Sequence, residues 1–315
     1  IYLLLISVAF VQPFNAISQV AEVRYAAHSD VSIPFRDMKP VKDYFWEKWG
    51  REVEREIPNQ ITRFPDADPK WIDGVRQDTY PTNPSKEMLV DPIVNFDGLN
   101  NSHNTGGRVT PPDPAGDVGP NHYVQVVNSM LQVFNKSGGS LFGPVTTATI
   151  WSDFTGPWTG HNDGDAIVLY DETVDRWVIS QFAIQCGTYG SYTQYEMIAV
   201  STSPDPTGSY YRYAFQFDYM PDYPKLGVWN DGYYMAINRF NSNNNNSWVG
   251  AAACVMERSK MLAGDPTARM IYFKTELIGG SGSAAGNACA SMMPSDCDGT
   301  LPGTGTPNYF AYITT

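Results

Sequence analysis

The hydrophobic pattern of the chain consists mainly of short β-type runs rather than helical stripes. Residues 165–171 contain a continuous apolar run, which is typical of a strand buried on both faces. A polar turn follows at 172–175, and further β-rich runs lie at 176–182, 195–202 and 210–217. Four such runs within 165–217 predict one antiparallel sheet of the size of a propeller blade.

The same order of elements recurs along the chain, as it must if such sheets are to cover one another's faces. In each copy an Asp precedes a short run, and an aromatic residue follows 10 to 12 positions later. The pairs are Asp113 and Tyr123, Asp165 and Trp177, Asp222 and Tyr233, and Asp298 and Tyr309. We therefore predict an all-β fold: a β-propeller over residues 92–315, truncated at its C-terminus, with about four blades represented.

Two segments precede the predicted propeller. Residues 1–11 form an apolar run, and a small-x-small pattern follows at 16–18, so we expect a signal peptide over 1–18 that is truncated at its start. Residues 19–91 form an N-terminal extension. Within it, a stripe at every fourth position predicts one amphipathic helix that ends before Pro58 and packs on the propeller or on a neighbouring domain; its members are Val41, Phe45, Trp49, Val53 and Ile57. A membrane-surface helix is the alternative, but the mixed charge of the other faces argues against it.

Composition and charge narrow the classes of partner. The formal net charge of −12 argues against a nucleic-acid backbone or an anionic membrane, and we expect no membrane span in the mature chain. Only 17% of residues are charged and 13% are aromatic, which is typical of an extracellular β protein that meets neutral ligands. We therefore expect a secreted or cell-surface protein whose partner is an extracellular glycan or a surface protein.

The four cysteines form an even set, which in a secretory setting suggests disulfide bonds. Cys289 and Cys297 lie in one irregular loop, where a bond between them is expected. Cys186 and Cys254 lie in neighbouring predicted blades, and buried thiols are the alternative for them. No Cys-x-x-Cys motif is present, and no His–Cys spacing suggests zinc or iron.

Candidate chemistry centres on Asp113, Asp165 and Asp222, which start the predicted innermost strands. One interpretation is that each side chain caps its own turn by accepting backbone N–H groups. The other is a ring of carboxylates that faces the axis and binds a cation or a sugar. The oxygen-rich stretch 162–165 has the look of a calcium loop, which makes Asp163 and Asp165 candidate ligands for Ca²⁺, although the full EF-hand pattern is missing.

Several aromatic residues and one histidine are candidate ligand-binding groups. At the mouth of a propeller they would stack on sugar rings, whereas packing between blades is the structural alternative. These residues are His122, Trp177, Trp229, Tyr233 and Tyr234.

Four stretches of this sequence resemble a group of large bacterial secreted proteins of poorly defined function that carry a propeller-like module. The stretches are 116–125, 165–177, 205–211 and 222–234. The resemblance implies a secreted or cell-surface setting and brings no established catalytic residue.

A looser similarity is to five-bladed glycosidases of the arabinanase type, in which acids on innermost strands meet in a central funnel. It implies that Asp113, Asp165 and Asp222 act in glycoside hydrolysis. The chain departs from that pattern because no Glu lies near the start of the third repeat; Glu196 and Glu257 lie on other strands. The expected function is thus a binding or adhesion module, with a glycoside hydrolase and a structural display domain as alternatives.

Overall fold

The structure is a computed structural model of the 315-residue chain. It describes residues 21–42, 93–104, 109–275 and 289–312. The predicted signal peptide and nearly all of the predicted amphipathic helix lie outside these ranges. In the part of the chain that is described, no helix has both the length and the apolar character needed to cross a bilayer.

The described residues form an all-β fold of antiparallel sheets, as the hydrophobic pattern predicted. The first sheet contains β3 (Ala115–Val118), β4 (His122–Val127), β5 (Met130–Asn135) and β6 (Ser140–Thr146) in this spatial order. The second has the order β2 (His28–Val31), β10 (Tyr210–Phe217), β9 (Thr193–Ser201), β8 (Arg176–Cys186) and β7 (Ile167–Asp171). The third has the order β1 (Glu22–Tyr25), β14 (Arg269–Lys274), β13 (Ser247–Glu257), β12 (Gly232–Asn241) and β11 (Met220–Val228).

Shorter elements join these sheets. A two-stranded sheet pairs β15 (Met293–Pro294) with β16 (Phe310–Ala311), and β15 lies beside β11 and β12. The helical turns are η1 (Phe35–Asp37), η2 (Asn101–His103), η3 (Thr147–Trp151) and α2 (Arg258–Leu262).

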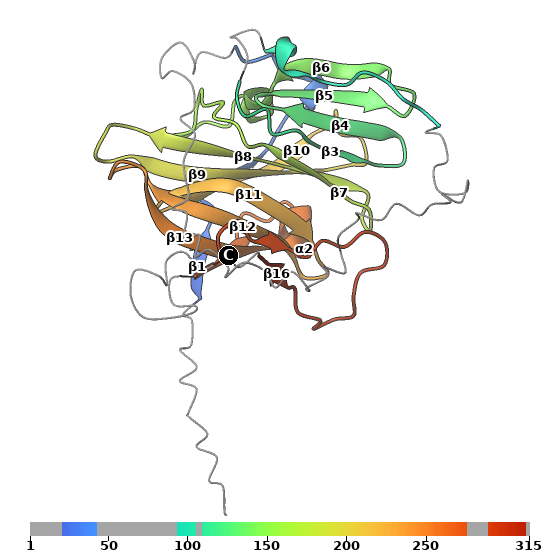
Figure 1. Cartoon of the computed structure of the whole chain (residues 1–315). Coiled ribbons are helices and arrows are strands. Elements are labelled where there is room, and N and C mark those ends of the chain that lie inside the picture. Colours follow the sequence, from blue (N-terminus) through green and yellow to red (C-terminus); the bar gives the residue numbers. More distant parts are fainter. Residues whose placement is uncertain (1–20, 43–92, 105–108, 276–288, 313–315) are drawn as a thin grey trace, which may run out of the picture.

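The three large sheets stack face to face, with the second in the middle (Figure 1). Side chains alternate across β9, so Tyr195 and Met197 face the first sheet while Ile198 and Val200 face the third. Both faces of β9 are therefore buried, and the second sheet contributes to two hydrophobic cores. This explains why Met197, Ile198, Ala199 and Val200 form a continuous apolar run in β9.

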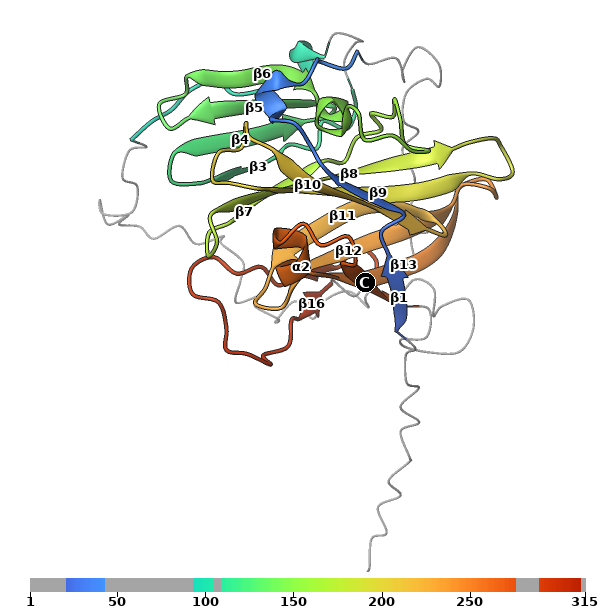
Figure 2. The same ribbon diagram turned by 180° about the vertical axis from the view of Figure 1, so that it is seen from behind.

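The N-terminal segment crosses the outer edges of all three sheets (Figure 2). Its strand β1 adds to β14, its strand β2 adds to β10, and Phe35 of η1 then packs on Phe142 of β6. Arg212 of β10 holds this N-terminal segment by a bidentate ion pair with Asp30 of β2, with Nε–Oδ1 at 2.8 Å and Nη2–Oδ2 at 2.6 Å. Without β1 and β2, the strands β14 and β10 would be the unpaired outer edges of their sheets. The sequence pattern did not indicate that residues of the N-terminal segment would pair with these edges.

The first strands of the sheets, β3, β7 and β11, lie next to one another, and β15 continues the row. Carboxylates join this row across the sheets. Asp117 Oδ2 accepts the N–H of Tyr170 at 2.7 Å, and Asp296 Oδ1 accepts the N–H of Val228 at 2.7 Å. We call β3, β7, β11 and β15 the axial strands.

Most predicted strands are confirmed, and one expectation is wrong. Asp298 does not begin the fourth copy, since it lies in the loop between β15 and β16. The short run that actually precedes this loop is β15, and its two residues are too few for a periodic signal in the sequence.

Candidate functional site

The structure brings together Asp113, Asp165 and Asp222 from three different sheets. Asp113 and Asp165 each lie two residues before an axial strand, β3 and β7, and Asp222 is the third residue of β11. The side chains of Asp113 and Asp165 are hydrogen-bonded to each other, and the charges of Asp113 and Asp222 both act on Asp165. The three aspartates predicted as a group thus form one cluster, which we call the axial carboxylate cluster.

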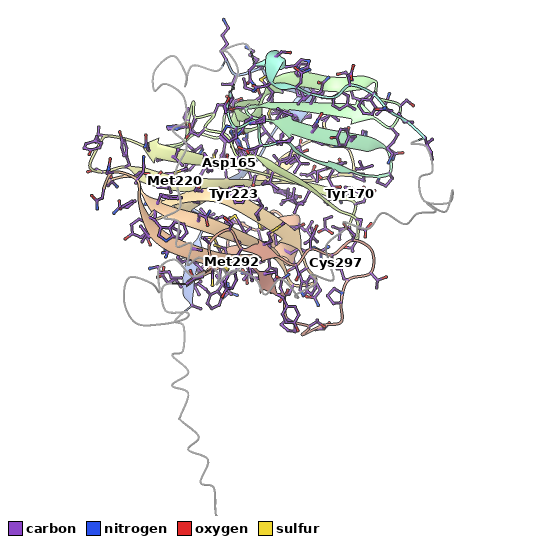
Figure 3. The ribbon with its side chains drawn as sticks, viewed as in Figure 1. Asp165, Tyr170, Met220, Tyr223, Met292 and Cys297 are labelled. Atoms are coloured by element: carbon purple, nitrogen blue, oxygen red, sulfur yellow. The ribbon has the colours of Figure 1, made fainter. Side chains whose placement is uncertain are left out.

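Local backbone geometry sets the direction of these side chains. Asp113 and Asp165 have φ values of 34° and 51°, a left-handed conformation that Asp tolerates better than most residues. In β11 the pairing register shifts between Asp222 and Lys225, and Tyr223 has a φ of 51°. The irregularity leaves the Tyr223 side chain 44% exposed beside the cluster. Figure 3 labels Asp165 and Tyr223 close together at the meeting of the second and third sheets.

Lys225 supplies a positive charge to the cluster. Its half-buried ammonium group feels the charges of Asp165, Asp113 and Asp222, which favour the protonated form, whereas desolvation is the larger effect and lowers the Lys225 pKa. The Nζ atom lies 3.3 Å from the centre of the Tyr223 ring, a cation–π contact. The cluster therefore contains three carboxyl groups, one ammonium group and one exposed aromatic face.

The ionisation of Asp165 is strongly perturbed. Burial raises its pKa first, and the nearby charges of Asp222 and Asp113 raise it further, so that it reaches about 7. Lys225 and the N–H of Tyr223, which lies 3.2 Å from Asp165 Oδ2, oppose this rise only in part. Burial also raises the pKa of Asp113. At neutral pH, a proton is therefore partly retained on Asp165 between two other carboxyl groups.

Asn128 holds the first two aspartates in place. Its Nδ2 donates to Asp113 Oδ2 at 2.9 Å, and its Oδ1 accepts the N–H of Asp165 at 2.9 Å. The side chain is buried, and a Cβ atom on Gly164 would lie 3.1 Å from its Oδ1. Asn128 thus fixes the spacing between the first and second sheets at the cluster. It has no distinguishing pattern in the sequence, because its partners lie 15 and 37 residues away.

Replacing Asn128 by Ala is expected to lower the free energy of unfolding by about 2 kcal/mol, because the buried N–H of Asp165 loses its acceptor. Urea denaturation followed by tryptophan fluorescence measures the change. Asn121→Ala, at an exposed turn position, is the matched control and is expected to have little effect. Equal stabilities of the two variants would contradict the role assigned to Asn128.

The predicted ligand-binding aromatics lie at the other end of the axial strands. Trp177 pairs with Tyr170 and Tyr233 pairs with Val228, five or six residues beyond the aspartates along β7 and β11. At a rise of about 3.3 Å per residue, this separates them from the cluster by roughly 15–20 Å. A single site made of the predicted carboxylates and the predicted aromatics therefore does not form.

Each of those residues has a structural partner instead. Trp177 is 1% exposed and donates to Pro204 O, and Tyr233 is fully buried and donates to Asp171. The other three are Trp229, which is buried and donates to Thr306 O, Tyr234, which donates to Asp231, and His122, which pairs with Asn135 at the start of β4. Tyr223, which the sequence analysis did not select, is the exposed aromatic residue at the cluster.

The two aspartates predicted as calcium ligands point to different places. Asp163 Oδ2 accepts the N–H of Ile184 at 2.7 Å and contacts His161 Nδ1 at 2.9 Å, whereas Asp165 Oδ2 accepts from Tyr223. Within the described ranges, no group of three His, Cys, Asp or Glu side chains is arranged to hold a metal ion. At the axial carboxylate cluster, the Lys225 ammonium group supplies the positive charge.

The predicted disulfide between Cys289 and Cys297 is also corrected. Both residues are free thiols in the structure, as are Cys186 and Cys254. Cys289 is buried against Met292 and other apolar residues, while Cys297 Sγ donates to Thr300 O beyond β15.

Comparison of the chain with protein-family models, with curated proteins and with solved structures gives no match.

Proposed function

We propose that this chain is a secreted or cell-surface binding module, built as a propeller-like row of sheets, that binds carbohydrate at the axial carboxylate cluster. The observation that carries the proposal is the convergence of Asp113, Asp165 and Asp222 on Lys225 beside the exposed ring of Tyr223. Carboxylates and ammonium groups hydrogen-bond sugar hydroxyls, and an aromatic face stacks on a sugar ring.

The propeller-like arrangement is supported by a bond that joins the first sheet to the second and that occurs again between the third sheet and the residue that precedes β15. Asn128 follows β4 and accepts the N–H of Asp165, and Asn238 of β12 accepts the N–H of Ser291 at 2.9 Å. Ser291 lies two residues before β15 and has a φ of 53°, close to the 51° of Asp165. Ser291 thus stands before β15 as Asp165 stands before β7, which supports β15 as the start of a fourth repeat.

The binding proposal predicts that cluster variants lose ligand. For a glycan identified on an array, Tyr223→Ala is expected to weaken binding about tenfold, since aromatic stacking contributes about 1.4 kcal/mol. Asp165→Asn is expected to weaken it at least as much, because the variant removes the carboxyl group at the centre of the cluster. Isothermal titration of the purified chain measures both effects.

Tyr189→Ala is the matched control, because Tyr189 is 78% exposed in the hairpin between β8 and β9. Unchanged binding in this variant is expected. If Tyr223→Ala and Asp165→Asn bind as tightly as the wild type, the site is wrong. If no glycan binds the wild-type chain, carbohydrate is the wrong ligand class.

Glycoside hydrolysis is the second candidate, favoured by the Asp165 pKa of about 7, which suits a general acid. The hydrogen bond between Asp113 and Asp165 limits this candidate, because acid and base in glycosidases stand about 5–9.5 Å apart. Those two residues therefore cannot form the catalytic pair, and Asp222 would have to be the partner of Asp165. Release of new reducing ends from the bound glycan by the wild type, and not by Asp165→Asn, would support hydrolysis over simple binding.

A further inference from the structure

A glutamic acid is buried in the interface between the second and third sheets, which we call the joint. Glu196 of β9 has no exposed surface, and neither carboxyl oxygen has a hydrogen-bond partner among the described residues. The hydroxyl of Ser180 lies near enough to favour the charged form, yet its Oγ atom is likewise buried without a hydrogen bond of acceptable geometry. An unpaired buried carboxylate is costly, whereas a neutral carboxylic acid is tolerated far better.

The pairing register places Glu196 at the joint. It lies opposite Phe182 of β8 on one side and opposite Phe215 of β10 on the other. Its face of β9 is the one that carries Ile198 and Val200 against the third sheet. If the pairing of β7 with β8 is extended by two residues, Asp165 lies opposite Phe182. Phe182 lies opposite Glu196, so Asp165 and Glu196 are two strand spacings apart, or about 10 Å.

The charged and titratable groups around this position are few and come from both sheets. On its own side, the charge of Asp165 disfavours ionisation of Glu196, and burial is the larger cause of a pKa well above the ordinary value. Across the joint is the Cys254 thiol of β13, whose pKa is raised by burial and by the charge of Glu196. The positive charges of Arg24 and Arg239 lower the pKa of Cys254 and so oppose these two effects. Tyr213 of β10 shares the apolar core and donates to Met261 O.

We propose that Glu196 is a pH-sensitive switch in the joint between the second and third sheets: the neutral acid fits the closed joint, and ionisation opens it. The second sheet carries Asp165, and the third carries Asp222, Tyr223 and Lys225. Opening the joint separates these residues and dismantles the axial carboxylate cluster. Release of a glycan at alkaline pH follows and rests on the proposed function, whereas the opening itself does not.

Hydrogen exchange read by mass spectrometry at pH 7 and pH 9.5, corrected for the intrinsic rates, tests the opening without any ligand. In the wild type, peptides from β9, β11 and β12 are expected to exchange at least tenfold faster at pH 9.5, while β4 and β5 stay protected. Glu196→Gln, a neutral isostere, is expected to keep the protection of all five strands at both pH values. Glu196→Leu serves as a second neutral variant if the Gln variant does not fold.

Two controls separate Glu196 from other ionising groups. Glu257→Gln removes a carboxylate held by Arg269 and Lys260 at the surface and is expected to open as the wild type does. Cys254→Ala removes the buried thiol and is expected to open as well. Alkaline exchange that persists in both neutral Glu196 variants, or that rises equally in β4 and β5, overturns the switch. If β9, β11 and β12 exchange faster at pH 9.5 as expected but the chain binds no glycan, only the proposed function is overturned.

Discussion

An Asp171→Ala variant is expected to lose roughly 3–5 kcal/mol of stability. The loss is large because the substitution leaves the buried guanidinium group of Arg258 without its carboxylate partner. Asp171 is fully buried at the end of β7 and receives Arg258 Nε at 2.6 Å and Arg258 Nη2 at 2.8 Å. It also accepts the hydroxyl of Tyr233 at 2.9 Å. Arg258 begins α2 and Tyr233 lies in β12, so the interaction joins the second sheet to the third.

Chemical denaturation followed by fluorescence measures the loss. The double variant Asp171→Leu with Arg258→Met removes both charges and is expected to recover much of the stability, since apolar replacement of a whole buried pair is often neutral. A loss below about 1 kcal/mol in Asp171→Ala would mean that solvent screens the pair as it screens a surface ion pair. In that case the joint depends on apolar packing alone.

An Asp165→Asn variant is expected to become more stable than the wild type as the pH rises. Folded Asp165 keeps its proton up to about pH 7, whereas in the unfolded chain it is released near the ordinary value of 3.8. Between these values the folded state binds more protons, so the stability of the wild type falls as the pH rises from about 4 to about 7. The stability lost through ionisation of Asp165 is on the order of 4 kcal/mol in total, and it is not regained above pH 7.

Asn lacks this ionisation and keeps an oxygen that can accept the N–H of Tyr223. The two proteins are therefore expected to match near pH 4 and to diverge steadily up to pH 8, as measured by urea denaturation at each pH. Asp231→Asn, at an exposed turn, is expected to follow the wild-type curve. Parallel curves for Asp165→Asn and the wild type would refute the raised pKa. Higher stability combined with lost glycan binding would mark Asp165 as a residue kept for function at the expense of stability.

Much of the fold follows from local sequence pattern. The limits of β10 were predicted correctly as 210–217, because aromatic residues alternate there with Arg, Ala and Gln between clear turns. The additions of β1 and β2 were not foreseen. Their partners β14 and β10 lie more than 170 residues away, and pairing at such a distance leaves no periodic trace.

The candidate site was predicted in part. The spacing of Asp113, Asp165 and Asp222 within the repeat indicated that they would share one end of the sheets, and the structure brings them together. Tyr223 and Lys225 were missed because they lie within the same predicted run as Asp222. A Pro between them, at position 224, is the signal that was overlooked, since Pro inside a strand marks an irregularity.

The sequence by itself determined the all-β class, the limits of most strands and the common position of three aspartates, because alternation, turn residues and repeat spacing are local properties. Only the tertiary structure decided what those groups do. Burial and mutual charge raise the pKa of Asp165, and the strand pairing buries Glu196 in a joint. It also sets the predicted aromatics at the far end of the axial strands. These properties depend on distances between residues that are remote in the chain, and a linear pattern carries no such distances.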